Sequence, residues 1–248
     1  MPTKGFGSAK TNEIDKVVEE SLAWLKAKSN KKVRDDMGPR YGIIAPKAFG
    51  VSMSLMQKLA KELGTSHELA EALWKTGWYE ARTVAAFVED PSRVTPAQMD
   101  RWCRVFDNWA ICDTVCFKLF DRTPHAFLKI EQWAKRREEF VKRAAFALLA
   151  SVALHDKSAE DTKFLRCLPF IEQAATDERN FVKKGVSWAL RSVGRRPGLL
   201  GASVELAEKL AGSEIASARW VGKDALKDLS KVVAKRKTTP KKAGAVAR

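Results

Sequence analysis

Histidine and cysteine are scarce in this chain of 248 residues, and the scarcity argues against several kinds of site. The three histidines are scattered, so Ser-His-Asp and Cys-His catalytic arrangements have little support: His67, His125 and His155. The four cysteines match no disulfide framework and complete no zinc set: Cys103, Cys112, Cys116 and Cys167. We therefore expect a reduced, intracellular chain that binds no metal.

Long apolar runs and phosphate-binding loops are also missing. No stretch approaches the ~20 apolar residues of a membrane span, and the first residues, MPTKGFGSAK, lack the apolar region of a signal peptide. Gly5-Phe6-Gly7 lacks the remainder of a dinucleotide or phosphate loop. We expect no membrane partner, no nucleotide, no flavin or other cofactor, and a cytoplasmic location.

Acidic residues are outnumbered. Lys and Arg total 45 against 30 Asp and Glu, a formal charge of +15. Residues 231–248 hold seven of the basic residues and no acid, and the remaining chain still carries +8. This excess favours polyanionic partners, nucleic acid first and anionic membranes second. We expect a flexible N-terminus (1–10), one folded domain (11–234) and a basic, disordered tail (235–248).

Apolar spacing predicts an all-α chain, because apolar residues recur at intervals of three and four and no long segment alternates. Thr95-Pro96-Ala97-Gln98 is typical of a helix start with an N-cap, a first-position proline and a capping-box glutamine. Thr123-Pro124 indicates a second start. Gly64 and Gly212 indicate helix ends, and Pro197-Gly198 separates two helices. About eleven or twelve helices are expected.

An internal repeat runs through the second half of the chain. Residues 140–152 (FVKRAAFALLASV) resemble residues 181–193 (FVKKGVSWALRSV) at an offset of 41, with Arg143 on Lys184. A weaker copy begins at Trp220, at an offset of 39. A period near 40 in a helical chain is typical of HEAT or armadillo helix pairs, which stack into a curved solenoid with a concave face.

One predicted helix, Val105 to Phe120, carries an acid within its apolar stripe. The stripe comprises Trp102, Val105, Phe106, Trp109, Cys116 and Phe120, and Asp113 lies one turn after Trp109. An inward carboxylate is costly unless it has a partner or a function. Pairing with an arginine or a neighbouring helix end would explain Asp113, and a place in the core would explain Trp109.

Two further side chains stand out against the repeat. Arg143 borders the apolar face of its helix, where a solvated or salt-bridged repeat residue is the simple alternative. Trp188 occupies the repeat position held by Ala147 in the preceding copy, which indicates either a site or a core role. The eight tryptophans supply flat apolar faces on which sugars or bases can pack.

Four segments together carry a family resemblance. They are 108–113 (NWAICD), 141–145 (VKRAA), 185–191 (GVSWALR) and 48–51 (AFGV), the last preceded by Arg40-Tyr41. In these the chain resembles the AlkD-like alkylpurine DNA glycosylases of the DNA alkylation repair group, over about residues 35–230. Asn108 and Ala110 depart from the family's pattern, and the lysine-rich tail is not general in it.

The resemblance implies a HEAT-like solenoid whose concave, basic face binds duplex DNA. It implies that Asp113 is the catalytic carboxylate, that Trp109 and Trp188 pack on the sugar and backbone of the lesion, and that Arg143 contacts phosphate. Tyr41 is a third aromatic candidate. Further DNA-binding candidates lie in or beside the same motifs: Lys142, Lys183, Lys184 and Arg191.

The implied reaction is hydrolysis of the N-glycosidic bond of N3- or N7-alkylated purines in duplex DNA by a monomer. Such a base is already cationic, so it leaves without a general acid, and a fixed carboxylate can stabilise the oxocarbenium-like sugar while it orients water. A deep base-flipping pocket is not expected. Two alternatives remain: a non-catalytic HEAT scaffold that binds DNA or protein, and a membrane-surface or RNA-binding helical protein supported by charge alone.

Overall fold

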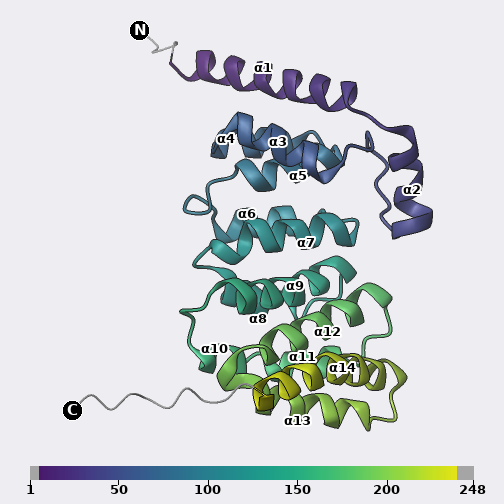
Figure 1. The fold of residues 1–248 in the computed structure, drawn as a ribbon. Helices are drawn as coiled ribbons and strands as arrows, with labels where there is room; N and C mark the ends of the chain where they lie inside the picture. Colours follow the sequence, from purple (N-terminus) through teal and green to yellow (C-terminus); the bar gives the residue numbers. More distant parts are fainter. Residues whose placement is uncertain (1–5, 239–248) are drawn as a thin grey trace. The chain divides into compact units, whose positions relative to one another are not determined.

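The computed structural model describes the backbone of residues 6–238 and the side chains of residues 12–234. Fourteen α-helices and two short 3₁₀ helices (η) make up its regular structure, and residues 6–238 contain no strand (Figure 1). The all-α prediction is confirmed. The predicted domain limits, 11 and 234, lie inside the first and last helices, and residues 1–5 and 239–248 lie outside the described part.

Two compact units divide the chain between Leu148 and Leu149, within helix α9. The helices up to that point are α1 (Phe6–Ala27), α2 (Lys31–Tyr41), α3 (Met53–Leu63), α4 (His67–Lys75), α5 (Tyr79–Val88), α6 (Pro96–Cys103), α7 (Trp109–Lys118), η1 (Phe120–Arg122), α8 (Ala126–Trp133) and α9 (Glu139–His155). The second unit continues with α10 (Asp161–Leu165), α11 (Leu168–Ala174), α12 (Asn180–Gly194), η2 (Pro197–Leu199), α13 (Leu200–Ala211) and α14 (Ala216–Thr238).

The polar caps explain where several helices begin and end. Thr95 caps α6 by accepting the amide hydrogen of Gln98, and Pro96 is its first residue, as predicted. The capping-box part of that prediction is wrong. The side-chain amide of Gln98 does not bond back to Thr95; its Nε2 donates to Glu89 Oε2 at 2.6 Å. Gly64 and Gly212 do follow the last residues of α3 and α13.

The predicted helix from Val105 to Phe120 is too long at both ends. Asn108 Oδ1 accepts the amide hydrogens of Ala110 and Ile111, which starts α7 at Trp109 and leaves Val105 exposed in a loop. Thr123-Pro124 does not begin a helix either. The Thr123 hydroxyl donates to the Phe120 carbonyl and closes η1, and α8 begins at Ala126.

Tryptophans form much of the interior of the first unit, where α1, α3–α5 and α6–α7 follow one another as layers (Figure 1). The rings of Trp74 and Trp102 stack with centroids 3.9 Å apart. The indole N–H of Trp102 donates to Glu71, and that of the buried Trp133 donates to Asp100. These three tryptophans belong to the core and not to a base-binding surface.

Close helix approach shapes the second unit, in which α12, α13 and α14 pack together. A Cβ on Gly222 of α14 would lie 2.2 Å from Ala211 N and 2.6 Å from Ala207 O of α13, so no larger residue fits without displacing backbone. Each copy of the sequence repeat lies within one helix: α9, α12 and α14. Pro197-Gly198 separates α12 from α13 as predicted, within η2.

Candidate functional site

Two buried thiols set the register between α7 and α9 in the first unit. Cys112 Sγ donates to the Phe140 carbonyl at 3.7 Å, and Cys116 Sγ donates to the Ala144 carbonyl at 3.6 Å. The partners advance by one turn in the same direction, so the helices lie side by side and parallel. Burial raises the pKa of Cys116 well above its usual value, which keeps it a thiol donor. This register places Asp113 beside α9.

Asp113 and Arg143 form the central ion pair of the site. Arg143 Nε donates to Asp113 Oδ1 at 2.9 Å, and Nη2 donates to Oδ2 at 2.7 Å, a two-point contact between planar groups. The side chains are 7% and 19% exposed for Arg143 and Asp113 respectively. Of the two structural explanations that the sequence left open for Asp113, the structure shows pairing with an arginine and not a bond to a helix end.

Burial and pairing act in opposite directions on this acid. Desolvation raises the pKa of Asp113, while the charge and hydrogen bonds of Arg143 lower it, and burial is the larger effect. For Arg143, desolvation lowers the pKa, but Asp113 more than compensates and the pKa rises. Burial therefore makes the charged form of Asp113 less favourable, whereas the guanidinium of Arg143 remains charged next to it.

Trp109 is held at the beginning of α7, on the same helix face as Asp113 four residues later. Its indole Nε1 donates to the backbone carbonyl of Tyr41 at 2.9 Å, and its side chain is half-buried. The Tyr41 ring is 49% exposed and lies 5.2 Å from the guanidinium carbon of Arg40. The structure thus brings Tyr41, Trp109, Asp113 and Arg143 together within one unit.

A buried carboxylate that the sequence analysis missed shapes the segment after Tyr41. Glu80, fully buried, accepts the backbone N–H groups of Phe49, Gly50 and Val51 at 2.8–3.2 Å. Gly50 has φ +83°, and a Cβ there would lie 2.3 Å from Asn30 O. The glycine in the 48–51 motif marked the turn, but only the fold places Glu80 of α5 beneath it.

The remaining candidates lie mainly on α12 of the second unit. Lys184, Trp188 and Arg191 share one helix face, with Lys184 exposed and the other two half-buried. Arg191 Nε donates to the Ser187 carbonyl at 3.3 Å and lies 3.6 Å from Asp224 Oδ2. That Trp188 shares a surface with Asp113 stays a prediction.

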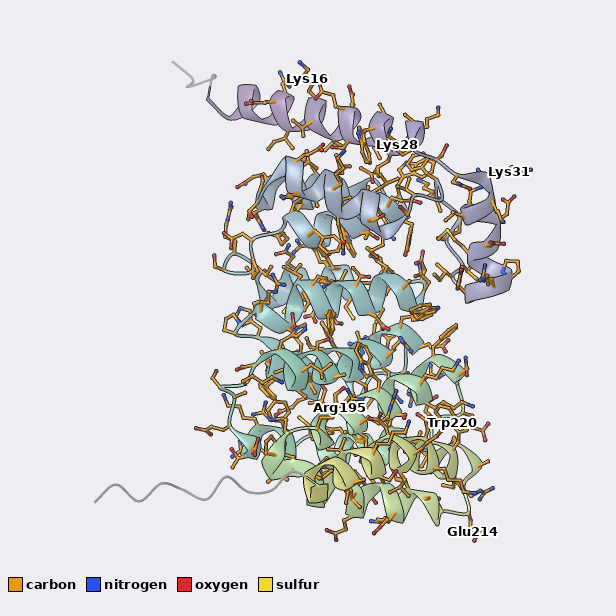
Figure 2. All side chains as sticks on the ribbon, in the orientation of Figure 1. Lys16, Lys28, Lys31, Arg195, Glu214 and Trp220 are labelled. Atoms are coloured by element: carbon orange, nitrogen blue, oxygen red, sulfur yellow. The ribbon has the colours of Figure 1, made fainter. Side chains whose placement is uncertain are left out.

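Two lysines complete the set of candidates. Lys183 Nζ lies 5.2 Å from the ring centroid of Trp220, which is labelled on α14 in Figure 2. The half-buried Lys142 precedes Arg143 on α9 of the first unit. Their contacts with DNA remain predictions.

Three further observations concern the part of the chain that the structure describes. No group of three or more His, Cys, Asp or Glu side chains there could hold a metal ion. No described helix is long and apolar enough to cross a membrane. The four cysteines lie buried in this part of the chain, and no disulfide joins them.

The successive helical layers are typical of a HEAT-like repeat fold. The chain belongs to the DNA alkylation repair enzyme family, whose model matches residues 22–229, and this confirms the resemblance noted in the sequence. A solved structure with a TM-score of 0.73 shares the fold at 20% identity, covering 87% of this chain and 94% of the other. It is described as belonging to "a new family of proteins related to the HEAT-like repeat DNA glycosylases with affinity for branched DNA structures". None of the curated proteins compared matches the chain.

Proposed function

We propose that this protein is a DNA glycosylase that hydrolyses the N-glycosidic bond of N3- or N7-alkylated purines in duplex DNA. The observation that carries the proposal is the paired Asp113 carboxylate one helical turn from the anchored indole of Trp109. Membership of the DNA alkylation repair family supports it. We propose that the protein acts as a monomer and needs no cofactor.

The proposed role of Asp113 is to stabilise positive charge on the deoxyribose as the base departs. A carboxylate ~4 Å from a developing cation gains about 4 kcal/mol at an effective dielectric constant of 20, and only the part absent from the ground state accelerates the reaction. The cationic base needs no proton to leave. Each carboxylate oxygen also has acceptor capacity beyond its bond to Arg143, enough to orient a water molecule.

Arg143 is proposed as a positioning residue that DNA phosphate also contacts. Its two donors hold both Asp113 oxygens in one orientation. A DNA phosphate can also accept hydrogen bonds from a guanidinium, so Arg143 would link the backbone of the bound DNA to the acid.

The aromatic residues are proposed to shape the surface on which the lesion lies. The hydrogen bond to Tyr41 fixes the edge of Trp109, and an indole face can pack on deoxyribose and favour a nearby cation. Trp188 is proposed as the second such face and Tyr41 as the third. Lys142, Lys183, Lys184 and Arg191 are proposed to contact the DNA backbone.

A second candidate is a DNA-binding scaffold without excision activity. The related solved structure is described by its affinity for branched DNA. The bidentate pair also gives Asp113 a complete structural role, since a buried carboxylate bonded to arginine needs no catalytic explanation. Both candidates predict DNA binding, and they differ in whether a base is released.

The deciding experiment is single-turnover release of free base from a duplex with one N7-methylguanine, with protein in excess. The glycosylase proposal expects release well above the spontaneous rate and an abasic strand that alkali cleaves. Binding of the unmethylated duplex and of a four-way junction of the same sequences is measured alongside. Tight junction binding with release at the spontaneous rate would establish the scaffold and overturn the glycosylase.

A further inference from the structure

A small basic pocket opens in the first unit, near the beginning of α7. Its volume is about 290 Å³, and the residues that matter here are Lys47, Gly77, Tyr79, Arg82, Asp107 and Ile111. The volume is at the lower limit of small-molecule sites, about 300–1,000 Å³. We call it the Lys47–Arg82 pocket. None of the candidate site residues of the family resemblance lines it.

Two cations converge in this pocket. A Cβ built on Gly77, which has φ +76°, would lie 3.9 Å from both Lys47 Nζ and Arg82 Nη2. Both charged groups therefore border the space beside the α-carbon of Gly77, which has no side chain to fill it. Like charges placed this close repel unless an anion lies between them, so their convergence favours an anionic ligand.

Neither cation is neutralised within the described part of the structure. Lys47 and Arg82 form no salt bridge there, and the buried Nε of Arg82 has no hydrogen-bond partner. The Arg82 guanidinium carbon lies 5.4 Å from the ring centroid of Trp74, which holds the side chain in place. A buried donor without an acceptor is costly, and a ligand oxygen would remove that cost.

The remaining titratable groups leave the pocket net positive. Asp107 contributes one negative charge, and its Oδ1 already accepts from Asn108 Nδ2 at 2.7 Å. Burial, with the charge of Glu80, raises the pKa of Tyr79 to about 12, so the phenol is neutral at physiological pH. Two cations and one anion make the pocket suited to a small, highly charged anion and unsuited to an apolar ligand.

We propose that the Lys47–Arg82 pocket binds one phosphate group of the DNA strand that lies across Trp109. Ile111 of the pocket lies two residues after Trp109 on α7, and Lys47 lies in the loop that follows Tyr41. The pocket is thus beside the candidate site but separate from the Asp113–Arg143 pair. The inference rests on the proposed function only in taking DNA as the ligand; it needs no base excision.

The first test uses inorganic phosphate and nuclear magnetic resonance. Titration of the wild-type protein should shift the backbone amide signals of Gly77 and its neighbours in a saturable way, and Lys47→Gln with Arg82→Gln should abolish the shifts. The control pair is Lys16→Gln with Lys28→Gln, labelled at the α1 end of the unit in Figure 2, which removes the same charge elsewhere. Equal loss in the control pair would overturn the site.

The second test asks whether the phosphate comes from DNA. For an undamaged duplex, the pocket double variant should bind about tenfold more weakly, and the log–log dependence on salt should fall by about 0.9 for one lost phosphate contact. The control pair should change both the duplex affinity and its salt dependence by less than the pocket double variant does. Unchanged duplex affinity in a variant that no longer binds inorganic phosphate would identify a free-phosphate site and overturn the DNA proposal.

Two single substitutions protect the test against misfolding. Lys47 is exposed, so Lys47→Glu should leave the melting temperature unchanged while it weakens duplex binding more than Lys47→Gln does. Asp107→Asn removes the one anion of the lining and should tighten inorganic phosphate several-fold. Weaker binding after Asp107→Asn would contradict the proposal. If the variants respond in these ways but the protein releases no methylated base, the phosphate site is supported and the glycosylase proposal is overturned.

Discussion

Helices α9 and α12 arise from the same sequence repeat, and their shared positions serve the same purpose. Val141 and Val182 are both buried, as are Leu149 and Leu190. Each pair lies at an offset of 41 residues, at buried positions of its helix. Apolar residues that both copies of the repeat retain therefore indicate packing in the core. They say little about what the protein does.

The same helices differ where their sequences differ. Arg143 of α9 is buried against Asp113, whereas its counterpart Lys184 of α12 is exposed. Ala147 is fully buried, whereas its counterpart Trp188 is half-buried. The comparison teaches that departures from the repeat, and not the repeat itself, mark the residues on which a functional hypothesis can rest. The following substitutions test that lesson.

The largest effect is expected for Asp113→Asn. Loss of the charge that opposes the oxocarbenium-like sugar should slow base release by about 100- to 1,000-fold, the effect typical of removing one transition-state contact. Single-turnover release of N7-methylguanine measures it. Duplex affinity should hold or increase, because a negative group is removed.

Asp100→Asn is the matched control, because Asp100 also bonds a buried cation. Its Oδ2 accepts from Lys129 Nζ at 2.7 Å, and Lys129 is 3% exposed. Both substitutions should lower the melting temperature to a similar extent, since each leaves a buried cation with a neutral partner. Equal loss of base release in the two variants would return Asp113 to a structural role.

Sequence reasoning predicted the fold well because it rests on local chemistry. Three-and-four spacing, Thr95-Pro96 and the glycine ends are short-range features that depend little on tertiary contacts, although the same Thr-Pro signal at Thr123 does not begin a helix. It missed the break at Asn108, since an apolar stripe continued across it, and Asn108 is itself a strong cap.

The partners within the site were harder to predict. Asp113 and Arg143 are 30 residues apart, and Trp109 and Tyr41 are 68 residues apart. Asp113 and Arg143 meet only because α7 and α9 lie side by side in a parallel register, and no spacing in the sequence predicts that register. The Lys47–Arg82 pocket has no motif at all, because its cations come from a loop and a helix that meet only in the fold.

The next effect concerns the two repeat cations. Arg143→Ala should lower the free energy of unfolding by about 3 kcal/mol, because it leaves the largely buried Asp113 without its partner. Lys184→Ala, at the equivalent repeat position, should change it by less than about 0.5 kcal/mol. Urea denaturation measures both. A similar loss from each substitution would mean that the two positions are equivalent after all.

A smaller effect tests the third copy of the repeat, in α14. Gly222→Ala forces a Cβ into the backbone of α13 and should destabilise the chain by about 2 kcal/mol. Gly201→Ala is the control: a Cβ there meets nothing within 4 Å, and alanine should gain about 0.5 kcal/mol from its helix preference. Thermal unfolding separates them, and a neutral Gly222→Ala would show that α13 and α14 lie farther apart.

The smallest effect distinguishes the repeat copies by their contact with DNA. Lys184 of α12 and Lys223 of α14 occupy the same repeat position, at an offset of 39, and both are exposed. Lys184 shares a helix face with Trp188, whereas the third copy has a lysine, Lys227, where Trp188 stands. If the aromatic departure marks the DNA-binding copy, Lys184→Gln should remove one phosphate contact and Lys223→Gln none.

The measurement is duplex affinity across a range of salt concentrations. Lys184→Gln should lower the log–log slope by about 0.9, and Lys223→Gln should leave it unchanged although the same charge is lost. The equal net charge of the two variants makes the comparison strict, because long-range attraction falls equally in both. Equal slopes would show that position in the repeat, and not the tryptophan beside it, decides which lysines face the DNA.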